Sequence, residues 1–363
     1  MSKAEKKQRI IFIDLLRAFA VLQMVQGHTV DVLLANEFRS YESLSYSIWH
    51  FMRGMTAPIF MFTSGTVFTY LFRLVDEPFE VNPRVIKGLK RVLLLLTIGY
   101  LLRFPTLNPF NFQYITESQL NVFYTVDVLH LIGFGLFFIM LFAVISEKIK
   151  IGDTATFFIA ALIFIVPTQY FKNIDWLAYL PKPIANYFYP GAGSLFPLFP
   201  WAGYMLLGAI FGSRLAKNPT IFRTTSFSIR TILIGAFLII FVYAFNFMVN
   251  STTKVHFDSY DYLTIIFRVG FVLVLTGFVS LISQSIQSIP HIIILVGRNT
   301  LLIYVVHLLI LYGSVINPGL IILWGNKLNP TLTIISAVLM IILMVSMVIL
   351  LSKLKIKNKQ LVT

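Results

Sequence analysis

Hydrophobic residues recur along the chain in runs of about 20 residues, separated by short stretches that hold most of the charged and turn-forming residues. An α-helix needs a run of this length to cross a lipid bilayer. The pattern therefore predicts an all-α fold, a polytopic integral membrane helical bundle of about ten transmembrane helices. The ten segments lie near residues 10–34, 47–72, 85–104, 122–146, 154–171, 195–212, 229–249, 262–283, 299–316 and 331–351.

The basic residues predict the orientation of these segments. Ten crossings place both termini on one side, and the termini and loops of that side hold 20 of the 29 Lys and Arg residues, against 6 on the other side. Because basic residues accumulate in cytoplasmic loops, we expect both termini in the cytoplasm. The net charge of +14 then follows from topology, and no nucleic-acid partner is expected. We first interpret Arg73, Arg84 and Lys87 as basic residues that only determine the topology.

Composition agrees with a membrane protein and narrows the chemistry. Hydrophobic residues make up 57% of the chain and charged residues 12%, about half of the charged share of a soluble protein. The chain has no cysteine, which excludes disulfides and thiol nucleophiles, and no metal site is expected because the histidines lack ligand spacing. Gly208 and Gly212 form a small-xxx-small pattern that permits close helix packing. The outer loop Phe171–Ser194 is interpreted as a lid or plug over the outer face.

The first segment carries three ionisable residues in an apolar environment: Asp14, Arg17 and His28. Charges in a membrane helix are costly, so they usually face the protein interior and serve a function. Eleven residues are close to three helical turns, which places Arg17 and His28 on one face, about 16 Å apart along the axis. Asp14 lies three residues before Arg17 and is expected to pair with it.

Other polar residues are expected at a depth similar to that of His28, in the outer half of the membrane. A neutral buried histidine beside an aspartate can take a proton from an amine or hydroxyl, and Asp127 is placed to fix the tautomer of a neighbouring histidine. A single membrane histidine can equally be a hydrogen-bonding partner between helices. The outer layer comprises His28, His50, Arg53, Asp127, His130, Trp201, Arg268 and His307, while Arg298 and Asn299 lie at the inner end of the ninth segment.

Five segments together resemble the transmembrane acyltransferase superfamily, and within it the bacterial relatives of the heparan-α-glucosaminide N-acetyltransferase catalytic-domain family. The resemblance implies one transmembrane acyltransferase domain over residues 1–363, strongest over residues 10–315. In related membrane O-acyltransferases the Arg-x10-His pattern supplies a catalytic histidine and a donor-binding arginine, so these roles fall on His28 and Arg17. The resembling segments are IDLLRAFAVLQMVQGH (13–28), APIFMFTSGTVF (57–68), DVLHLIGFGLFF (127–138), FPLFPWAGYMLLGAIFG (196–212) and VGRNTLLIYVVHLLIL (296–311).

The resemblance implies transfer of an acetyl group from cytoplasmic acetyl-CoA to an amine or hydroxyl of a glucosamine-like sugar at the outer side. An amino-sugar transporter and a non-catalytic membrane subunit are the alternatives, and the acceptor, acyl chain length, mechanism and oligomeric state, a homo-oligomer included, stay open. We expect His28, Asp127 and His130 to be catalytic. The donor phosphates need cations, and the candidates are Arg17, Arg84, Lys87, Arg91 and Arg298. The acceptor candidates are His50, Arg53, Trp201, Arg268, Asn299 and His307.

Overall fold

The computed structural model of the chain describes residues 10–106, 115–252, 257–286 and 290–360. These residues form helices joined by short loops, with one isolated β-bridge between Leu34 and Leu328, so the predicted all-α fold is confirmed for the described residues. The α-helices are α1 (Ile11–Leu33), α2 (Leu44–Arg73), α3 (Pro83–Leu102), α4 (Glu117–Phe123), α5 (Val128–Ile149), α6 (Asp153–Ile165), α7 (Thr168–Asn173), α8 (Lys182–Ala185), α9 (Leu198–Lys217), α10 (Thr225–Asn250), α11 (Tyr262–Ser285), α12 (His291–Arg298), α13 (Thr300–Tyr312), α14 (Gly319–Trp324) and α15 (Pro330–Gln360). Short 3-10 turns are η2 (Asn36–Phe38), η3 (Trp176–Ala178), η4 (Pro190–Ala192) and η5 (Ile221–Arg223).

The chain divides into two compact units whose boundary falls within α2. The first unit takes in Met61–Leu101 and Gln113–Ser285, and so contains the second half of α2 and the helices from α3 to α11. The second unit takes in Ile11–Phe60, Leu102–Phe112 and the chain from Ile286 onward, and so contains α1, the first half of α2 and the helices from α12 to α15.

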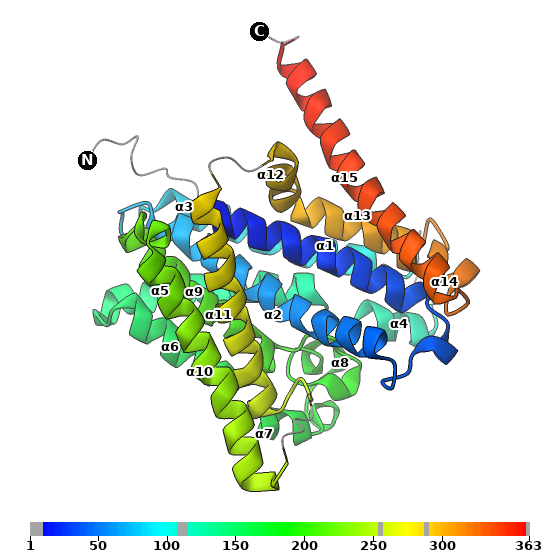
Figure 1. Cartoon of the computed structure of the whole chain (residues 1–363), viewed down its shortest axis with the longest axis horizontal. Helices are drawn as coiled ribbons and strands as arrows, with labels where there is room; N and C mark the ends of the chain where they lie inside the picture. Colours follow the sequence, from blue (N-terminus) through cyan, green and yellow to red (C-terminus); the bar gives the residue numbers. More distant parts are fainter. Residues whose placement is uncertain (1–9, 107–114, 253–256, 287–289, 361–363) are drawn as a thin grey trace. The chain divides into compact units, whose positions relative to one another are not determined.

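Close helix contacts at glycines organise the first unit. A Cβ atom at Gly208 would lie 2.1 Å from the carbonyl oxygen of Phe62, and one at Gly212 would lie 2.3 Å from that of Thr66. The hydroxyl of Thr66 donates to the Gly208 carbonyl at 3.0 Å. The small-xxx-small pattern therefore allows α9 to pack directly on α2, as predicted. Helices α10 and α11 lie side by side as an antiparallel pair, and α9 also packs on α5 and α6 (Figure 1).

Helix α1 is the central element of the second unit, where it contacts α12, α13 and α15 (Figure 1). The C-terminal end of α1 is connected to the segment before α15 by hydrogen bonds. The backbone of Leu34 pairs with Leu328, and the Arg39 guanidinium donates to the Asp31 carbonyl at 2.6 Å and the Asn326 side chain at 2.7 Å. A helix surrounded in this way can carry charges without exposing them to lipid.

Six helices of the described residues are long and apolar enough to cross a membrane, and a seventh candidate is the pair α12 and α13. The six spans run Leu44–Arg73, Val128–Ile149, Asp153–Asn173, Thr225–Asn250, Tyr262–Ser285 and Pro330–Leu354. This number is lower than the ten predicted. Segments 10–34, 85–104 and 195–212 do form helices, namely α1, α3 and α9. Charged residues lower the mean hydropathy of all three, in α9 through Arg214 and Lys217. The chain is therefore a helical membrane protein, and its described residues contain fewer spans than predicted when judged by helix length and hydropathy.

Two predicted segment boundaries differ from the structure for local reasons. The segment expected at 122–146 begins as α5 only at Val128, because Asp127 caps the N-terminus of this helix and α4 ends before it. The segment expected at 299–316 is the second half of a broken pair, since α12 and α13 meet at Asn299 with a bend of 73°. Hydropathy averages over both features and cannot detect them.

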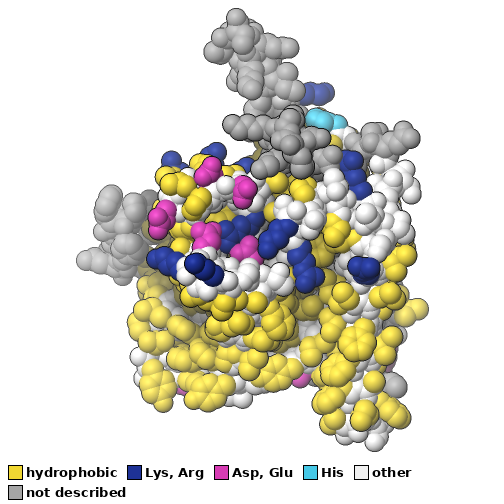
Figure 2. All heavy atoms as spheres, turned by 90° about the vertical axis from the view of Figure 1, so that its left-hand side faces the viewer, with side chains coloured by type: hydrophobic (Ala, Val, Ile, Leu, Met, Phe, Trp, Pro, Cys, Tyr) yellow, Lys and Arg dark blue, Asp and Glu magenta, His cyan; other side chains and the backbone are white. Residues whose placement is uncertain are grey.

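The outer surface of the helices is apolar, as a lipid-facing surface requires. Figure 2 shows a face where hydrophobic side chains form a continuous area and charged side chains gather at one edge. The helices α10 and α15 present large apolar side chains outward along much of their length, including Phe237 and Ile240 on α10 and Leu339 and Ile342 on α15.

The segment Phe171–Ser194, predicted to be a lid, folds into short helical turns held by aromatic stacking. The ring of Phe171 stacks on Phe199 with centroids 4.0 Å apart, and Trp176 stacks on Phe171 and on Phe188 at 5.0 Å each. The Tyr189 hydroxyl donates to the Asp175 carboxylate at 3.0 Å. The segment is therefore a packed element of the first unit, built mainly from its own aromatic side chains.

Candidate functional site

A pair of histidines lies between α1 and α13 in the second unit. The Nε2 atom of His307 is 3.4 Å from Nδ1 of His28, and the two ring centroids are 5.3 Å apart. The ring of Tyr312 packs edge-on against His28 with centroids 6.0 Å apart. His307 is fully buried, whereas His28 keeps part of its surface exposed. The two histidines that the sequence places at one depth are thus in direct contact.

The backbone fixes which nitrogens of this pair carry protons. Nδ1 of His307 is 2.8 Å from the carbonyl oxygen of Ile303, and a carbonyl can only accept, so this nitrogen carries a hydrogen. In the neutral ring Nε2 of His307 is then an acceptor, and it takes a hydrogen bond from Nδ1 of His28. The arrangement leaves Nε2 of His28 with its lone pair. In this tautomer Nε2 of His28 can accept a proton, and the predicted catalytic role of His28 stays a prediction.

The segment of α2 that faces α1 in the second unit carries the predicted acceptor residues Arg53 and His50. Arg53 forms an ion pair with Asp31 of α1, and Trp49 donates to Gln26 of α1 at 3.0 Å. His50 lies 3.3 Å from the hydroxyl of Tyr41, among exposed aromatic rings. The charge of Arg53 is thus compensated by Asp31, and His50 lies at the periphery of the unit.

The N-terminal end of α1 contacts the break between α12 and α13. Arg17 donates to the hydroxyl of Thr300, the first residue of α13, at 3.3 Å. A Cβ atom at Gly297 would lie 2.8 Å from the backbone oxygen of Asp14, so α12 passes closely over this part of α1. Since Arg17 and His28 lie on one continuous helix, they are about 16 Å apart along its axis. The predicted pairing of Asp14 with Arg17 stays a prediction.

Two predicted residues, Arg298 and Asn299, form the break itself. Arg298 is exposed at the last position of α12. The Asn299 side-chain amide donates to the Leu295 carbonyl at 2.8 Å, and its backbone N–H contacts the carbonyls of Leu295 and Val296. Asn299 therefore satisfies terminal carbonyls of α12.

The first unit holds a second candidate base, the dyad of Asp127 and His130. Nδ1 of His130 is 2.9 Å from Oδ1 of Asp127, and the two side chains are almost fully buried. The same carboxylate oxygen accepts from the backbone N–H of Leu129 at 2.9 Å, which caps the N-terminus of α5. Nδ1 of His130 also accepts from the backbone N–H of Asp127 at 3.3 Å, and Nε2 has no hydrogen-bond partner among the described residues. Asp127 and His130 are in direct contact, and the predicted orienting role of Asp127 stays a prediction.

A glycine and two tyrosines shape the surroundings of the dyad. A Cβ atom at Gly99 would lie 2.6 Å from the ring of His130, so this position of α3 must lack a side chain. The Tyr100 ring packs edge-on against His130 at 4.4 Å, and its hydroxyl is 2.8 Å from that of Tyr187. Burial and the hydrogen bond with Tyr100 raise the pKa of Tyr187, so its hydroxyl stays protonated at neutral pH.

The predicted donor residues of the first unit lie along α3. Arg84, Lys87 and Arg91 are spaced by three and four residues and so share one helix face, and Lys87 and Arg91 are exposed. Asn82 anchors the beginning of this helix, because its side chain accepts from the backbone N–H of Arg84 at 2.8 Å and donates to the Phe72 carbonyl at 3.2 Å. The face is therefore a rigid basic surface.

The remaining predicted residues, Trp201 and Arg268, are in contact in the first unit. The guanidinium carbon of Arg268 lies 5.4 Å from the centre of the Trp201 ring, and both side chains are buried. Trp201 belongs to α9 and Arg268 to α11, so the contact joins two helices. The sequence placed both residues in the outer layer of polar side chains, and the structure brings them together.

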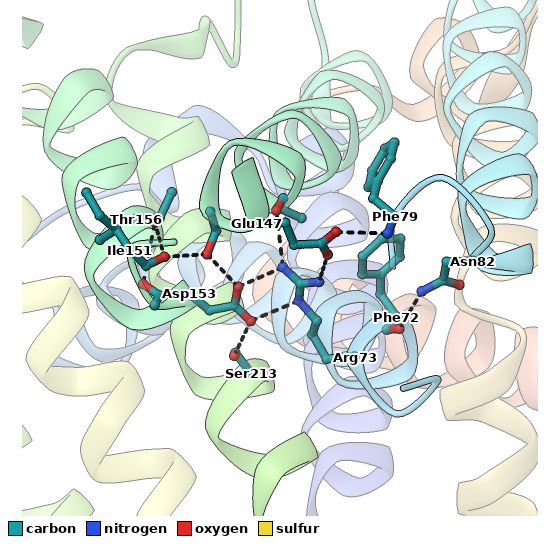
Figure 3. A network of polar contacts seen from close by, with 12 residues as sticks. Phe72, Arg73, Phe79, Asn82, Glu147, Ile151, Asp153, Thr156 and Ser213 are labelled. Atoms are coloured by element: carbon teal, nitrogen blue, oxygen red, sulfur yellow. Dashed lines mark hydrogen bonds and ion pairs between the residues drawn. The ribbon is translucent and has the colours of Figure 1, made fainter. Parts of the chain in front are cut away.

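Arg73, first interpreted as a topology residue, is a structural cation in the first unit (Figure 3). Its guanidinium donates to the carboxylate of Asp153 at 2.8 and 2.7 Å and also pairs with Glu147. Asp153 further accepts from Ser146 at 3.0 Å and from Ser213 at 2.7 Å. Because two carboxylates compensate this guanidinium, Arg73 is bound within the fold and is not a free donor-binding cation.

Several residues of these clusters were not predicted, although some had a signal in the sequence. Asp31 follows His28 by three residues on α1, which places it one turn away and marks it as a candidate partner. Tyr312 and Tyr187 had no such signal, because apolar segments contain many tyrosines. The expected catalytic residues fall in different units, His28 in the second and Asp127 and His130 in the first.

Comparison with known proteins identifies the family. No curated protein matches the chain. Residues 9–240 match the family described as heparan-alpha-glucosaminide N-acetyltransferase, catalytic. The match includes His28, Asp127 and His130 and covers more than half of the chain. The chain therefore belongs to the heparan-α-glucosaminide N-acetyltransferase catalytic family.

Proposed function

We propose that the protein is a membrane acetyltransferase that moves an acetyl group from cytoplasmic acetyl-CoA to an amine or hydroxyl of a glucosamine-like sugar at the outer side of the membrane. Membership of an N-acetyltransferase family supports the reaction type. The observation that carries the proposal is the contact of His28 with His307, in which the Ile303 carbonyl orients both rings. This contact gives His28 one free basic nitrogen, which is the group that acyl transfer to an amine or hydroxyl needs.

In the proposed reaction His28 acts as general base. The acceptor nitrogen or oxygen attacks the thioester carbonyl carbon, and its proton passes to Nε2 of His28. The new C–N or C–O bond forms as the C–S bond breaks, and the leaving thiolate takes the proton back from His28. His307 stabilises the transient imidazolium through the hydrogen bond with Nδ1. The dyad of Asp127 and His130 is the second candidate base, with the tautomer fixed by a carboxylate as in acyl-transfer triads.

The donor is proposed to bind through its phosphates at the cytoplasmic end. Arg17 contacts Thr300 at the N-terminus of α13, where unpaired backbone N–H groups add a partial positive charge. The basic face of α3, formed by Arg84, Lys87 and Arg91, offers further cations in the first unit, and Arg298 offers one in the second. Such charge-assisted contacts are the strong ones for phosphate.

The acceptor is proposed to bind among the polar side chains of the outer half. The proposal places the chain in a bacterial inner membrane with both termini in the cytoplasm, and the distribution of basic residues supports this orientation of the termini. The acceptor residues would be His50, Arg53, Trp201, Arg268, Asn299 and His307.

The decisive experiment uses proteoliposomes with acetyl-CoA on one side and glucosamine on the other. Transfer predicts release of coenzyme A that depends on the sugar and stops in His28→Ala, while acetyl-CoA binding persists. A general base supplies about 10²–10⁴-fold, so a larger loss indicates that His28 carries the acetyl group covalently. Acetyl exchange between donor and free coenzyme A without sugar tests that covalent route directly.

The controls are His50→Ala and His130→Ala, which remove the other histidines expected at similar depth. If His28→Ala retains more than a tenth of the wild-type rate, the base is another histidine, and loss of turnover in His130→Ala alone would assign it to the dyad. Sugar counterflow without release of coenzyme A would contradict the acetyltransferase proposal and indicate a transporter.

A further inference from the structure

Helix α3 of the first unit divides into a basic beginning and an uncharged remainder. Its charged residues are all basic and all precede Val92, and the remaining segment Val92–Leu102 carries no charge. Three of the basic side chains, which we call the basic cluster, are exposed: Lys87, Lys90 and Arg91. Residues three and four apart are neighbours on a helix, so Lys87 lies beside both other members and the like charges repel one another. The cluster therefore favours an anion as its counter-ion.

The carboxylates of the described residues do not supply this counter-ion. The exposed acidic residues of the loop that precedes α3 are Asp76, Glu77 and Glu80. Within the described part of the chain, none of them forms an ion pair with the basic cluster. Arg73 at the end of α2 differs from the cluster, because Glu147 and Asp153 compensate its charge. The positive charge of the basic cluster is therefore available to an anion from outside the chain.

Large apolar side chains lie between and beside these cations, and they are exposed as well. Ile86 is 63% exposed, Leu89 43%, Leu93 65% and Leu94 45%. On the face of the molecule shown in Figure 2, basic side chains likewise border a continuous apolar area. Lysine and arginine can lay their methylene stems along apolar surface and hold the charge at the level of the lipid headgroups. The beginning of α3 thus offers apolar surface for acyl chains directly beside cations for a headgroup.

We propose that the basic cluster binds the headgroup of an anionic phospholipid, whose acyl chains lie along the exposed apolar side chains of α3. Basic residues beside a membrane helix attract anionic lipids, and the attraction grows with each cation. Lys87 and Arg91 are also candidates for the phosphates of acetyl-CoA. The exposed leucines favour the lipid, because the water-soluble donor has no long acyl chain that would cover them. The inference does not depend on the proposed function, for which Arg17, Arg84 and Arg298 remain as donor-binding cations.

The test measures binding of phospholipids to the purified full-length protein in micelles of an uncharged detergent. Phosphatidylglycerol is the anionic probe, phosphatidylcholine with the same acyl chains is the neutral probe, and native mass spectrometry follows the bound lipid during titration. A basic residue near the headgroups raises the affinity for an anionic lipid about fivefold. Phosphatidylglycerol is therefore expected to bind the protein at least about tenfold more tightly than phosphatidylcholine. Added salt should reduce this preference, because it screens exposed charges.

Two triple variants separate this site from the effect of net charge. The variant Lys87→Gln/Lys90→Gln/Arg91→Gln is expected to lose most of the preference for phosphatidylglycerol. The matched control removes three other exposed cations of the first unit and should keep the preference; its substitutions are Lys148→Gln, Arg214→Gln and Lys217→Gln. The melting temperature without added lipid shows whether each variant is folded. If the first variant does not fold, Lys87→Gln and Lys90→Gln alone should each reduce the preference severalfold.

Equal affinity for the two lipids, or a preference for phosphatidylglycerol that persists in the first triple variant, would overturn the inference. A first triple variant that binds acetyl-CoA more weakly and still prefers phosphatidylglycerol would also overturn it, because the cluster would then bind the donor. The failure of the proposed function is distinct from these outcomes. A preference for phosphatidylglycerol that depends on the basic cluster, without any release of coenzyme A in proteoliposomes, would contradict the acetyltransferase proposal and leave the lipid site intact.

Discussion

Replacing Asp153 by alanine removes a carboxylate that accepts four hydrogen bonds in the first unit: two from Arg73 and one each from Ser146 and Ser213. The side chain of Asp153 is 9% exposed and that of Arg73 16%, so the pair is shielded from water. The substitution leaves the guanidinium buried with Glu147 as its remaining carboxylate partner. We therefore expect Asp153→Ala to destabilise the fold through an undercompensated cation.

The expected loss of stability follows from the burial of the ion pair between Asp153 and Arg73. Removing one partner of a buried ion pair costs about 3–5 kcal/mol, and the remaining contact of Arg73 with Glu147 points to the lower end, about 3 kcal/mol. Asp153→Asn keeps the shape of the side chain and loses its charge, so it should cost at least about 1.5 kcal/mol, the value of a hydrogen bond to a charged group.

The assay is the free energy of unfolding in mixed micelles titrated with sodium dodecyl sulfate. The matched control is Lys172→Met, which breaks the ion pair of Lys172 with Asp258. The two side chains are 31% and 38% exposed. An exposed pair contributes about 0–1 kcal/mol. The loss of stability in Asp153→Ala should exceed that in Lys172→Met by more than about 1 kcal/mol. A smaller difference would contradict the view that Arg73 is a structural cation.

Three further predictions address the dyad, the donor end and the topology. Gly99→Ala places a Cβ atom 2.6 Å from the His130 ring and should cost about 1–3 kcal/mol of stability in the same assay; an unchanged value would mean that the ring moves freely. Arg17→Ala should weaken acetyl-CoA binding about tenfold to a hundredfold by calorimetry with the fold retained, and unchanged affinity would leave Arg17 a structural residue. In this cysteine-free chain, Ser43→Cys and Ser251→Cys should react with a membrane-impermeant maleimide from outside and Ser226→Cys should not; the reverse pattern would invert the topology.

The sequence predicts those features that depend on a single helix or on a close backbone contact. Arg17 and His28 are eleven residues apart, so any helical segment places them on one face, and α1 is such a helix. Gly208 and Gly212 predict close packing because only a residue without a side chain permits it, and the identity of the partner helix, α2, comes from the structure.

Features that depend on tertiary pairing are beyond the sequence. The charge of Arg73 looks the same whether it marks a cytoplasmic loop or compensates Asp153, which lies 80 residues further along the chain. The sequence likewise places His28 and His307 at one depth, but their contact depends on how α1 and α13 pack. The prediction of helix caps and bends from the sequence fails for a different reason. Asp127 caps the beginning of α5 and Asn299 the end of α12 through local hydrogen bonds, which hydropathy does not register.

The continuity of α1 has a consequence for the choice of donor. Arg17 and His28 belong to one unbroken helix without an internal proline or bend, so the spacing between them does not adapt to the ligand. Coenzyme A carries its phosphates and its thioester at opposite ends of a long arm. Under the roles proposed for Arg17 and His28, this fixed separation would select donors by length as well as by charge. Acetyl thioesters of short thiols, which fill only the reacting end, should compete poorly at any concentration at which acetyl-CoA saturates the site.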